Sequence, residues 1–199
     1  MAALRAATGA TRAFGVSSGA LILLNAALAQ PFEALALFEP PLLPAGEAPI
    51  GLVERLEAEL GRGDVPAALV TGMRGARMGP GFVRRLPRPL LERMTAAMMD
   101  RDAGELPTFR ELAPTLPYDS RVIVECAGTA ERYRAVASST LLLGGARSGR
   151  WLEQALSTLE RTLPDVRRVE LPGIDHGGTE NADRRGKPAL VASALTSFL

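Results

Sequence analysis

The chain has 199 residues, which is enough for one domain with a sizeable core and a small insertion but too few for two independent domains. Its 23 basic residues nearly balance its 22 acidic residues and form no basic run, which argues against a nucleic-acid partner. The single cysteine, Cys126, cannot form an internal disulfide, and no cysteines or histidines have the spacing of metal ligands, so no metal is expected.

Residues 1–8 have the composition of the last turns of a helix, and Gly9 stands where a left-handed residue would end it. The longest apolar stretch, residues 20–28, is shorter than the about 20 residues that a membrane-spanning helix needs. We therefore predict no membrane span and a cytoplasmic location. A leader peptide is a competing interpretation, because arginines precede this stretch and "ALAQP" would allow cleavage before Gln30. Against it, cleavage would remove a predicted buried strand and helix, and serines and glycines interrupt the supposed leader.

A strand, a helix and a second strand are predicted next, at residues 11–17, 18–30 and 32–41. The second strand, "FEALALFEPP", is an apolar run before a proline pair, which is typical of a strand buried in a parallel sheet. Together the three elements form a strand-helix-strand unit, the usual connection between parallel strands.

Prolines and glycines then recur every few residues between short amphipathic segments, which predicts a helical insertion at residues 42–117. Regular alternation resumes after it. The predicted strands are 121–128, 139–145 and 167–173, and the predicted helices are 129–137, 149–164 and 187–199. The pattern predicts an α/β fold in which residues 1–41 and 118–199 form a mostly parallel sheet with helices on both faces.

Residues 15–19, Gly-Val-Ser-Ser-Gly, match G-x-S-x-G, a motif in which a strand turns at once into a helix. Such a turn forces Ser17 into strained backbone angles, and we expect a side chain at either glycine to crowd it. Ser17 would then project above the sheet as a nucleophile. The N–H of Ser18, at the start of the helix, can donate a hydrogen bond to an oxyanion.

A serine hydroxyl needs a base to take its proton, and the chain has one histidine, His176. His176 follows the last predicted strand in a glycine-rich loop, so it should share the carboxyl edge of the sheet with Ser17. A lone histidine is usually a surface or structural residue. Together with the motif, His176 becomes the candidate general base.

The segments "GVSSGAL", "LALFEPP", "TLLLGGARS" and "LPGIDHGG" resemble the C-terminal part of an α/β-hydrolase, and the resemblance covers nearly the whole chain. It implies that residues 42–117 are a cap over the active site. It also implies that the first strands of the fold, and a loop with a second oxyanion donor, precede Met1, so we expect an upstream start. Without them the first strand would be a bare sheet edge, open to self-association or to a partner chain.

The resemblance leaves several positions for the acid that orients His176. The commonest position in the family follows "TLLLGG", where this sequence has Ser148 instead of an aspartate. Some members, haloalkane dehalogenases among them, carry the acid after the strand that follows the motif, which corresponds to Glu39, our first choice. Glu125 is the second choice and Asp175 the third.

The sequence thus predicts a serine hydrolase of small carboxylic esters or related acyl substrates, without a cofactor. Ser17 is the predicted nucleophile, His176 the base and then the acid, and Glu39 the residue that orients His176. A serine rather than an aspartate as nucleophile argues against a dehalogenase or an epoxide hydrolase. The competing hypothesis is a catalytically inactive binding protein with the same fold, completed by a partner chain at the sheet edge.

Overall fold

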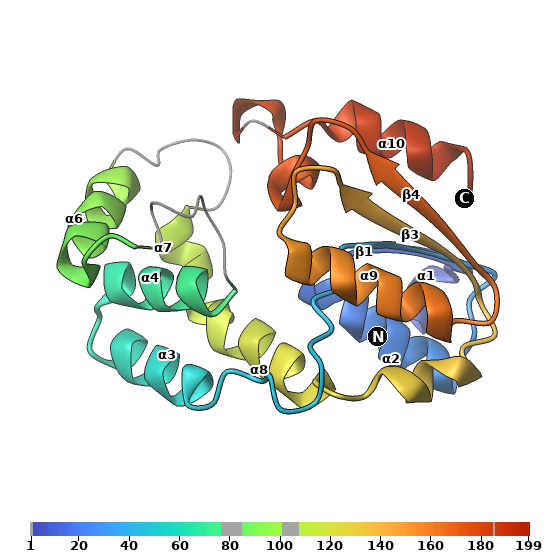
Figure 1. Cartoon of the computed structure of the whole chain (residues 1–199), viewed down its shortest axis with the longest axis horizontal. Coiled ribbons are helices and arrows are strands. Elements are labelled where there is room, and N and C mark those ends of the chain that lie inside the picture. Colours follow the sequence, from blue (N-terminus) through green and yellow to red (C-terminus); the bar gives the residue numbers. More distant parts are fainter. Residues whose placement is uncertain (1, 77–84, 101–107, 185) are drawn as a thin grey trace. The chain divides into compact units, whose positions relative to one another are not determined.

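The structure is a computed structural model that describes residues 2–76, 85–100, 108–184 and 186–199. The chain divides into two compact units (Figure 1). Residues Met1–Ala48 and Val122–Leu199 form one unit, which contains the described strands, and Pro49–Arg121 form a helical unit. The helical unit starts and ends several residues later than the predicted insertion at 42–117. Among the described residues, no helix has the length and apolar character needed to cross a membrane.

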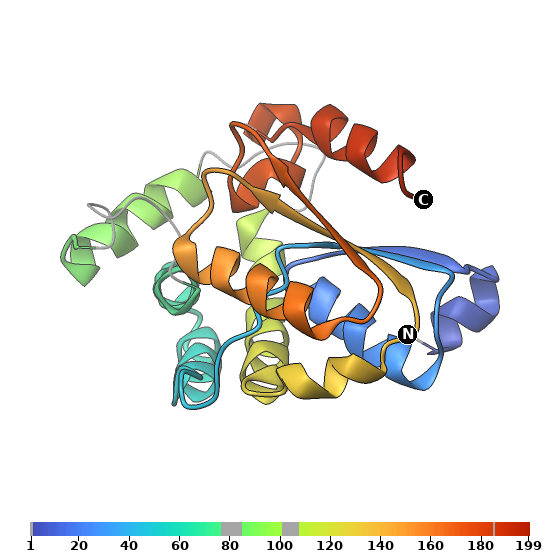
Figure 2. The same ribbon diagram turned by 45° about the vertical axis from the view of Figure 1, so that its right-hand side comes forward.

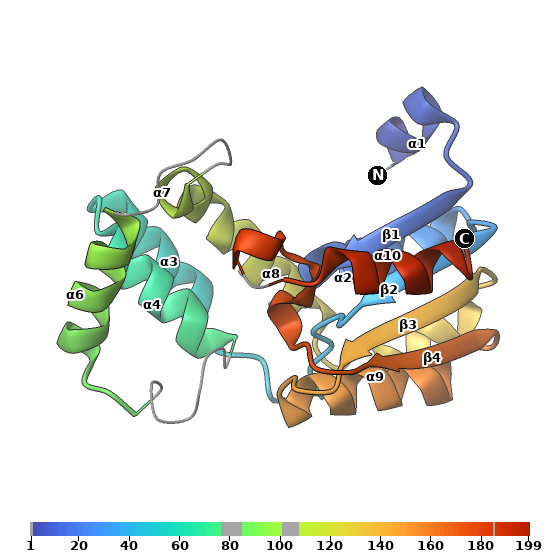
Figure 3. The same cartoon turned by 90° about the horizontal axis from the view of Figure 1, so that it is seen from above.

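The first unit is built on a parallel sheet with the strand order β1-β2-β3-β4 (Figure 3). The strands are β1 (Arg12–Val16), β2 (Ala34–Phe38), β3 (Ser139–Gly145) and β4 (Val166–Leu171). Each neighbouring pair is parallel, so the carboxyl ends of the strands share one edge of the sheet. The predicted α/β class with a mostly parallel sheet is confirmed.

Helices cover both faces of this sheet (Figure 2). One face carries α2 (Ser18–Ala29) and α9 (Arg150–Thr162), and the other carries α10 (Pro188–Thr196). Side chains of β2 alternate between the two cores, with Leu35 and Leu37 toward α2 and α9 and Phe38 toward α10. All five residues of β2 are buried, which is why its sequence is a continuous apolar run.

The chain around these strands follows most of the predicted elements. The N-terminal helix α1 (Ala2–Thr8) ends at Gly9, whose φ of +65° is the left-handed conformation that glycine adopts readily. Residues 129–137 were predicted to form a helix, and the shorter 3₁₀ helix η2 (Ala130–Ala135) lies there, with Tyr133 fully buried.

The predicted strand at residues 121–128 is wrong, because this segment belongs to a helix, α8 (Leu116–Cys126). Its β-branched residues favour a strand by propensity alone. In the structure Val122 and Ile123 pack against the core that contains α2, and Cys126 is buried there. Burial of one helical face therefore outweighs the local preference of the segment.

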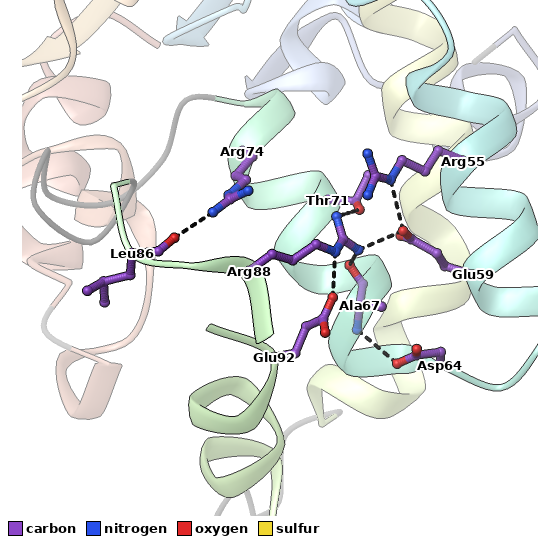
Figure 4. A network of polar contacts seen from close by, with 9 residues as sticks. All are labelled: Arg55, Glu59, Asp64, Ala67, Thr71, Arg74, Leu86, Arg88 and Glu92. Atoms are coloured by element: carbon purple, nitrogen blue, oxygen red, sulfur yellow. Dashed lines mark hydrogen bonds and ion pairs between the residues drawn. The ribbon is translucent and has the colours of Figure 1, made fainter. Parts of the chain in front are cut away.

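The helical unit consists of short helices held by polar side chains between them. The helices are α3 (Leu52–Gly61), α4 (Val65–Gly75), α6 (Arg88–Met99), α7 (Phe109–Leu112) and the 3₁₀ turn η1 (Ala113–Thr115), followed by the first part of α8. Arg88, at the start of α6, joins three of them (Figure 4). It donates to the Glu59 carboxylate in α3 at 2.7 Å, to the Thr71 hydroxyl in α4 at 3.0 Å, and to Glu92 in its own helix.

The carboxyl of Glu59 has a pKa below its usual value although the residue is only 4% exposed. Burial by itself raises the pKa of this carboxyl, but hydrogen bonds from Thr71 and Arg55 and the positive charge of Arg88 outweigh burial and lower it. Because the pKa is lower in the folded than in the unfolded chain, the stabilisation is present above the unfolded pKa. It is lost as the pH falls through the folded pKa.

Replacing Arg88 by methionine should destabilise the helical unit. The variant keeps much of the side-chain volume but leaves the Glu59 carboxylate with Arg55 as its charged partner, so we expect a loss of about 1 to 3 kcal/mol in the free energy of unfolding. Urea unfolding of the full chain at neutral pH measures it. The matched control is Arg93→Met in the exposed part of the same helix, and equal losses in both variants would contradict this account.

Candidate active site

The predicted site residues lie at the carboxyl ends of the parallel strands. Ser17 directly follows β1 and Glu39 directly follows β2. His176 opens the 3₁₀ turn η3 (His176–Thr179), in the loop after β4. Parallel pairing therefore brings together three residues that are up to 159 positions apart in the sequence.

The three side chains form a hydrogen-bonded chain. The Nδ1 of His176 lies 2.7 Å from Oε2 of Glu39, and its Nε2 lies 3.1 Å from Oγ of Ser17. A carboxylate can only accept, so Nδ1 carries the proton and Nε2 is left to accept the hydroxyl proton of Ser17. Glu39 is completely buried, which removes competing water from this contact.

Backbone strain within the described residues is concentrated at this site. Ser17 and Glu39 are the two non-glycine residues described with positive φ, at +54° and +46°. The ψ of Ser17 is −127°, a combination that residues with a Cβ rarely adopt. Such conformations cost on the order of 1 to 3 kcal/mol each and persist where the surrounding structure enforces them, often at functional sites.

One of the two motif glycines explains the tight turn at Ser17. A Cβ at Gly15 would lie 2.8 to 2.9 Å from Leu23, Ala20 and Gly19, because β1 and α2 approach closely there. A Cβ at Gly19 would meet no heavy atom within 4 Å. The prediction that both glycines avoid crowding is thus confirmed for Gly15 and wrong for Gly19.

Ser18 is the first residue of α2, so the helix begins directly after Ser17. The amide of Ala20 donates to the Ser17 carbonyl at 2.9 Å, which closes the first turn of the helix. The backbone N–H of Ser18 thus lies at the N-terminal end of a twelve-residue helix, where the helix dipole favours negative charge.

Of the candidate acids, the structure brings Glu39 to His176. Asp175 accepts a hydrogen bond from the Gly177 amide at 3.0 Å and so caps the η3 turn. Glu125, the second choice, lies in helix α8 and not in the strand that was predicted at residues 121–128. Ser148, where the family's commonest acid would stand, has a buried hydroxyl without a hydrogen-bond partner among the described residues.

A contact that the sequence analysis missed comes from Gly145, the last residue of β3. Its N–H donates to Oε1 of Glu39 at 2.7 Å. All four strands therefore contribute to one hydrogen-bonded chain, through Ser17, Glu39, Gly145 and His176. The glycine pair that ends "TLLLGG" is the signal that could have revealed it, because glycine at a strand end often marks a close backbone approach.

Across the part of the chain that the structure describes, no group of three or more histidine, cysteine or acidic side chains could hold a metal ion. Ser17, His176 and Glu39 thus have no neighbouring set of metal ligands within the described ranges.

No family model matches the sequence, and a search of curated proteins finds no match. Solved structures do resemble the chain. An α/β hydrolase from Sphaerobacter thermophilus has a TM-score of 0.68 and 29% sequence identity, and the match covers 96% of this chain and 70% of that one. A hydrolase from Pseudomonas aeruginosa has a TM-score of 0.56 and 20% identity, with coverages of 96% and 68%. A proline iminopeptidase from Mycobacterium smegmatis has a TM-score of 0.51 and 18% identity, with coverages of 98% and 69%.

The chain spans about two thirds of the length of the solved chains it matches, between 64% and 70% for the first three. Within that span the parallel sheet and the helices on both of its faces agree with the expectation from the sequence. The chain therefore has the α/β-hydrolase fold.

Proposed function

We propose that the protein is a serine hydrolase that cleaves small carboxylic esters or related acyl substrates. The observation that carries this proposal is the hydrogen-bonded chain from Glu39 through His176 to Ser17, with distances of 2.7 and 3.1 Å. Hydrolysis also agrees with the names of two structural neighbours, an α/β hydrolase and a hydrolase.

In the first half of the reaction, Oγ of Ser17 attacks the ester carbonyl carbon, and its proton moves to Nε2 of His176. The new C–O bond makes a tetrahedral oxyanion, to which the N–H of Ser18 is the proposed donor. Collapse of this intermediate breaks the bond to the leaving oxygen. That oxygen takes the proton from His176 and departs as the alcohol, which leaves an acyl group on Ser17.

Water completes the cycle by the same route. It attacks the acyl carbon while its proton moves to His176, and the bond to Ser17 then breaks. The carboxylic acid leaves and Oγ recovers the proton. In both halves Glu39 accepts the Nδ1 proton and stabilises the imidazolium, and this chemistry needs no cofactor or metal.

The strain at Ser17 supports a nucleophilic role. A serine that served packing alone would gain nothing from a φ of +54°, at which glycine is more stable. The geometry holds Oγ toward His176 instead, at a cost that the close approach of β1 and α2 sustains.

The helical unit Pro49–Arg121 is, by the resemblance to the family, the proposed cap of this site. This assignment is independent of the chemistry at Ser17, and a cap would act on substrate choice rather than on the proton transfers.

A second candidate function is supported by the outer edge of β1. Within the described residues β1 pairs with β2 alone, and the Ser17 N–H donates toward β2, to the Phe38 carbonyl at 2.9 Å. Backbone groups of successive residues alternate in direction, so those of Arg12, Phe14 and Val16 face away from β2. This edge is suited to strand addition by a second copy or by a partner chain.

Replacing Ser17 by alanine should abolish covalent reaction with a fluorophosphonate probe. In this reaction Oγ forms a bond to phosphorus, fluoride leaves, and the hydroxyl proton goes to His176. We expect the labelling rate, and the hydrolysis of 4-nitrophenyl acetate, to fall by at least about 10³-fold. Intact mass and peptide mapping locate the label. Ser193→Ala, on the exposed part of α10, is the control and should react like the wild type. Labelling that persists in Ser17→Ala would refute the assignment.

Replacing Ser17 by glycine should stabilise the fold while it removes the hydroxyl. Glycine accepts the positive φ without strain, so the free energy of unfolding should rise by about 1 kcal/mol. Thermal and urea unfolding measure it. Ser193→Gly within α10 should instead lower stability by about 0.5 to 1 kcal/mol. A loss of stability in Ser17→Gly would show that the turn is not strained at this residue.

Replacing Phe14 by proline should block strand addition at β1. Proline lacks the N–H that faces outward at this position, and an outer edge tolerates it better than a central strand does. If the edge function holds, analytical ultracentrifugation should find self-association in the wild type and in Phe14→Ala, and its loss in Phe14→Pro. A wild type that stays monomeric at all concentrations would exclude self-association through this edge.

A further inference from the structure

Gly145 lies against both Glu39 and the loop that leads to His176, although it has no side chain. It is the last residue of β3, between the strands that lead to Glu39 and to His176. Its backbone N–H donates a hydrogen bond to Glu39, and backbone atoms of Ile174 and Asp175 lie close to the position that a Cβ would occupy.

The N–H of Gly145 orients the Glu39 carboxylate beside the histidine. It donates to Oε1 at 2.7 Å, while Oε2 meets Nδ1 of His176 at 2.7 Å. The direction of this N–H is set by β3, because Leu143 and Gly144, the two preceding residues of the strand, are buried within the sheet. The N–H therefore fixes the rotation of a carboxylate that is completely buried.

Because Gly145 has no Cβ, the loop between β4 and His176 (the histidine loop) can approach the end of β3. A Cβ there would lie 2.5 Å from the carbonyl oxygen of Ile174 and 3.0 Å from Cα of Asp175. These are backbone atoms of the segment that leads directly into His176. The same carbonyl of Ile174 accepts a hydrogen bond from the Arg147 amide at 2.9 Å, so the loop is held close to the end of β3.

We propose that Gly145 is the positioning residue that places His176 against Glu39, whose carboxylate then holds the proton on Nδ1. It acts through Glu39, whose carboxylate it orients, and through the histidine loop, whose approach it permits. This inference rests on the proposed function only for its catalytic consequence, because the tautomer is a property of the resting protein.

The tautomer can be read directly, since His176 is the one histidine in the sequence. In tag-free, full-length protein labelled with ¹⁵N-histidine, each ring nitrogen gives an unambiguous NMR signal. The wild type should have a protonated Nδ1 with a far-downfield proton, and an unprotonated Nε2.

Gly145→Ala should lose this signature, because the new methyl group must displace the loop backbone. The fluorophosphonate labelling rate should fall on the order of 10²-fold, as expected when a catalytic group is misplaced by about 1 Å. The matched control is Gly144→Ala. Its Cβ would meet the end of the flexible Leu156 side chain at 2.6 Å and stay 3.7 Å from Oε1 of Glu39. It should keep the wild-type tautomer and most of the reactivity.

Glu39→Gln tests the N–H donor without adding a methyl group. The Gly145 N–H should hold the amide oxygen, which turns the amide NH₂ toward Nδ1 of His176. Nδ1 must then accept, so the proton should move to Nε2 and the signals should show the opposite tautomer. Glu39→Ala offers no partner and should give a mixture of tautomers.

Two results would overturn the inference. One is a folded Gly145→Ala variant, checked by circular dichroism, that keeps the wild-type tautomer and labelling rate. The other is a Glu39→Gln variant in which Nδ1 stays protonated. This second variant tests the inference even if Gly145→Ala fails to fold. A wild type with the expected tautomer that does not react with the probe would instead count against the proposed function alone.

Discussion

A carboxylate that is removed from water must be met by hydrogen-bond donors, and Glu39 meets two donors from different strands. The Gly145 amide of β3 and the His176 ring after β4 each approach one of its oxygens at 2.7 Å. An unmatched buried charge would cost several kcal/mol, so the loop after β4 and the end of β3 are stable in their places only together. The ring that Glu39 holds then lies 3.1 Å from Oγ of Ser17.

The parallel sheet makes this meeting possible. Parallel strands end at a common edge, and covering helices bury the central strands on both faces. Rigid strands bring polar groups to that edge with little freedom to rearrange, which suits proton transfer over short fixed distances. The positive φ angles of Ser17 and Glu39 occur at the ends of the two neighbouring strands β1 and β2, where tight packing supports them.

The helical unit uses a polar network in a different way. Arg88 contacts Glu59, Thr71 and Glu92, and thereby links α3, α4 and α6. Short helices with small apolar faces bury limited surface, so directional contacts of this kind help to define which helices pack together. These hydrogen bonds of Arg88 join residues of the helical unit and do not involve Ser17 or His176, which supports a structural role for the network within its own unit.

The sequence by itself determined the class of the fold and two members of the proposed hydrogen-bonded chain. Hydrophobic runs identified the segments of β1 to β4, and the G-x-S-x-G motif with a single histidine singled out Ser17 and His176. It did not determine the secondary structure of residues 121–128, because burial of one face of helix α8 in the core outweighed the strand preference of this β-branched run. It ranked Glu39 before Glu125 and Asp175 only through the resemblance to some family members, since all three are carboxylates near predicted element ends. Only the tertiary structure decided that choice and revealed Gly145, because both depend on which strands lie side by side and on the direction of a single backbone N–H.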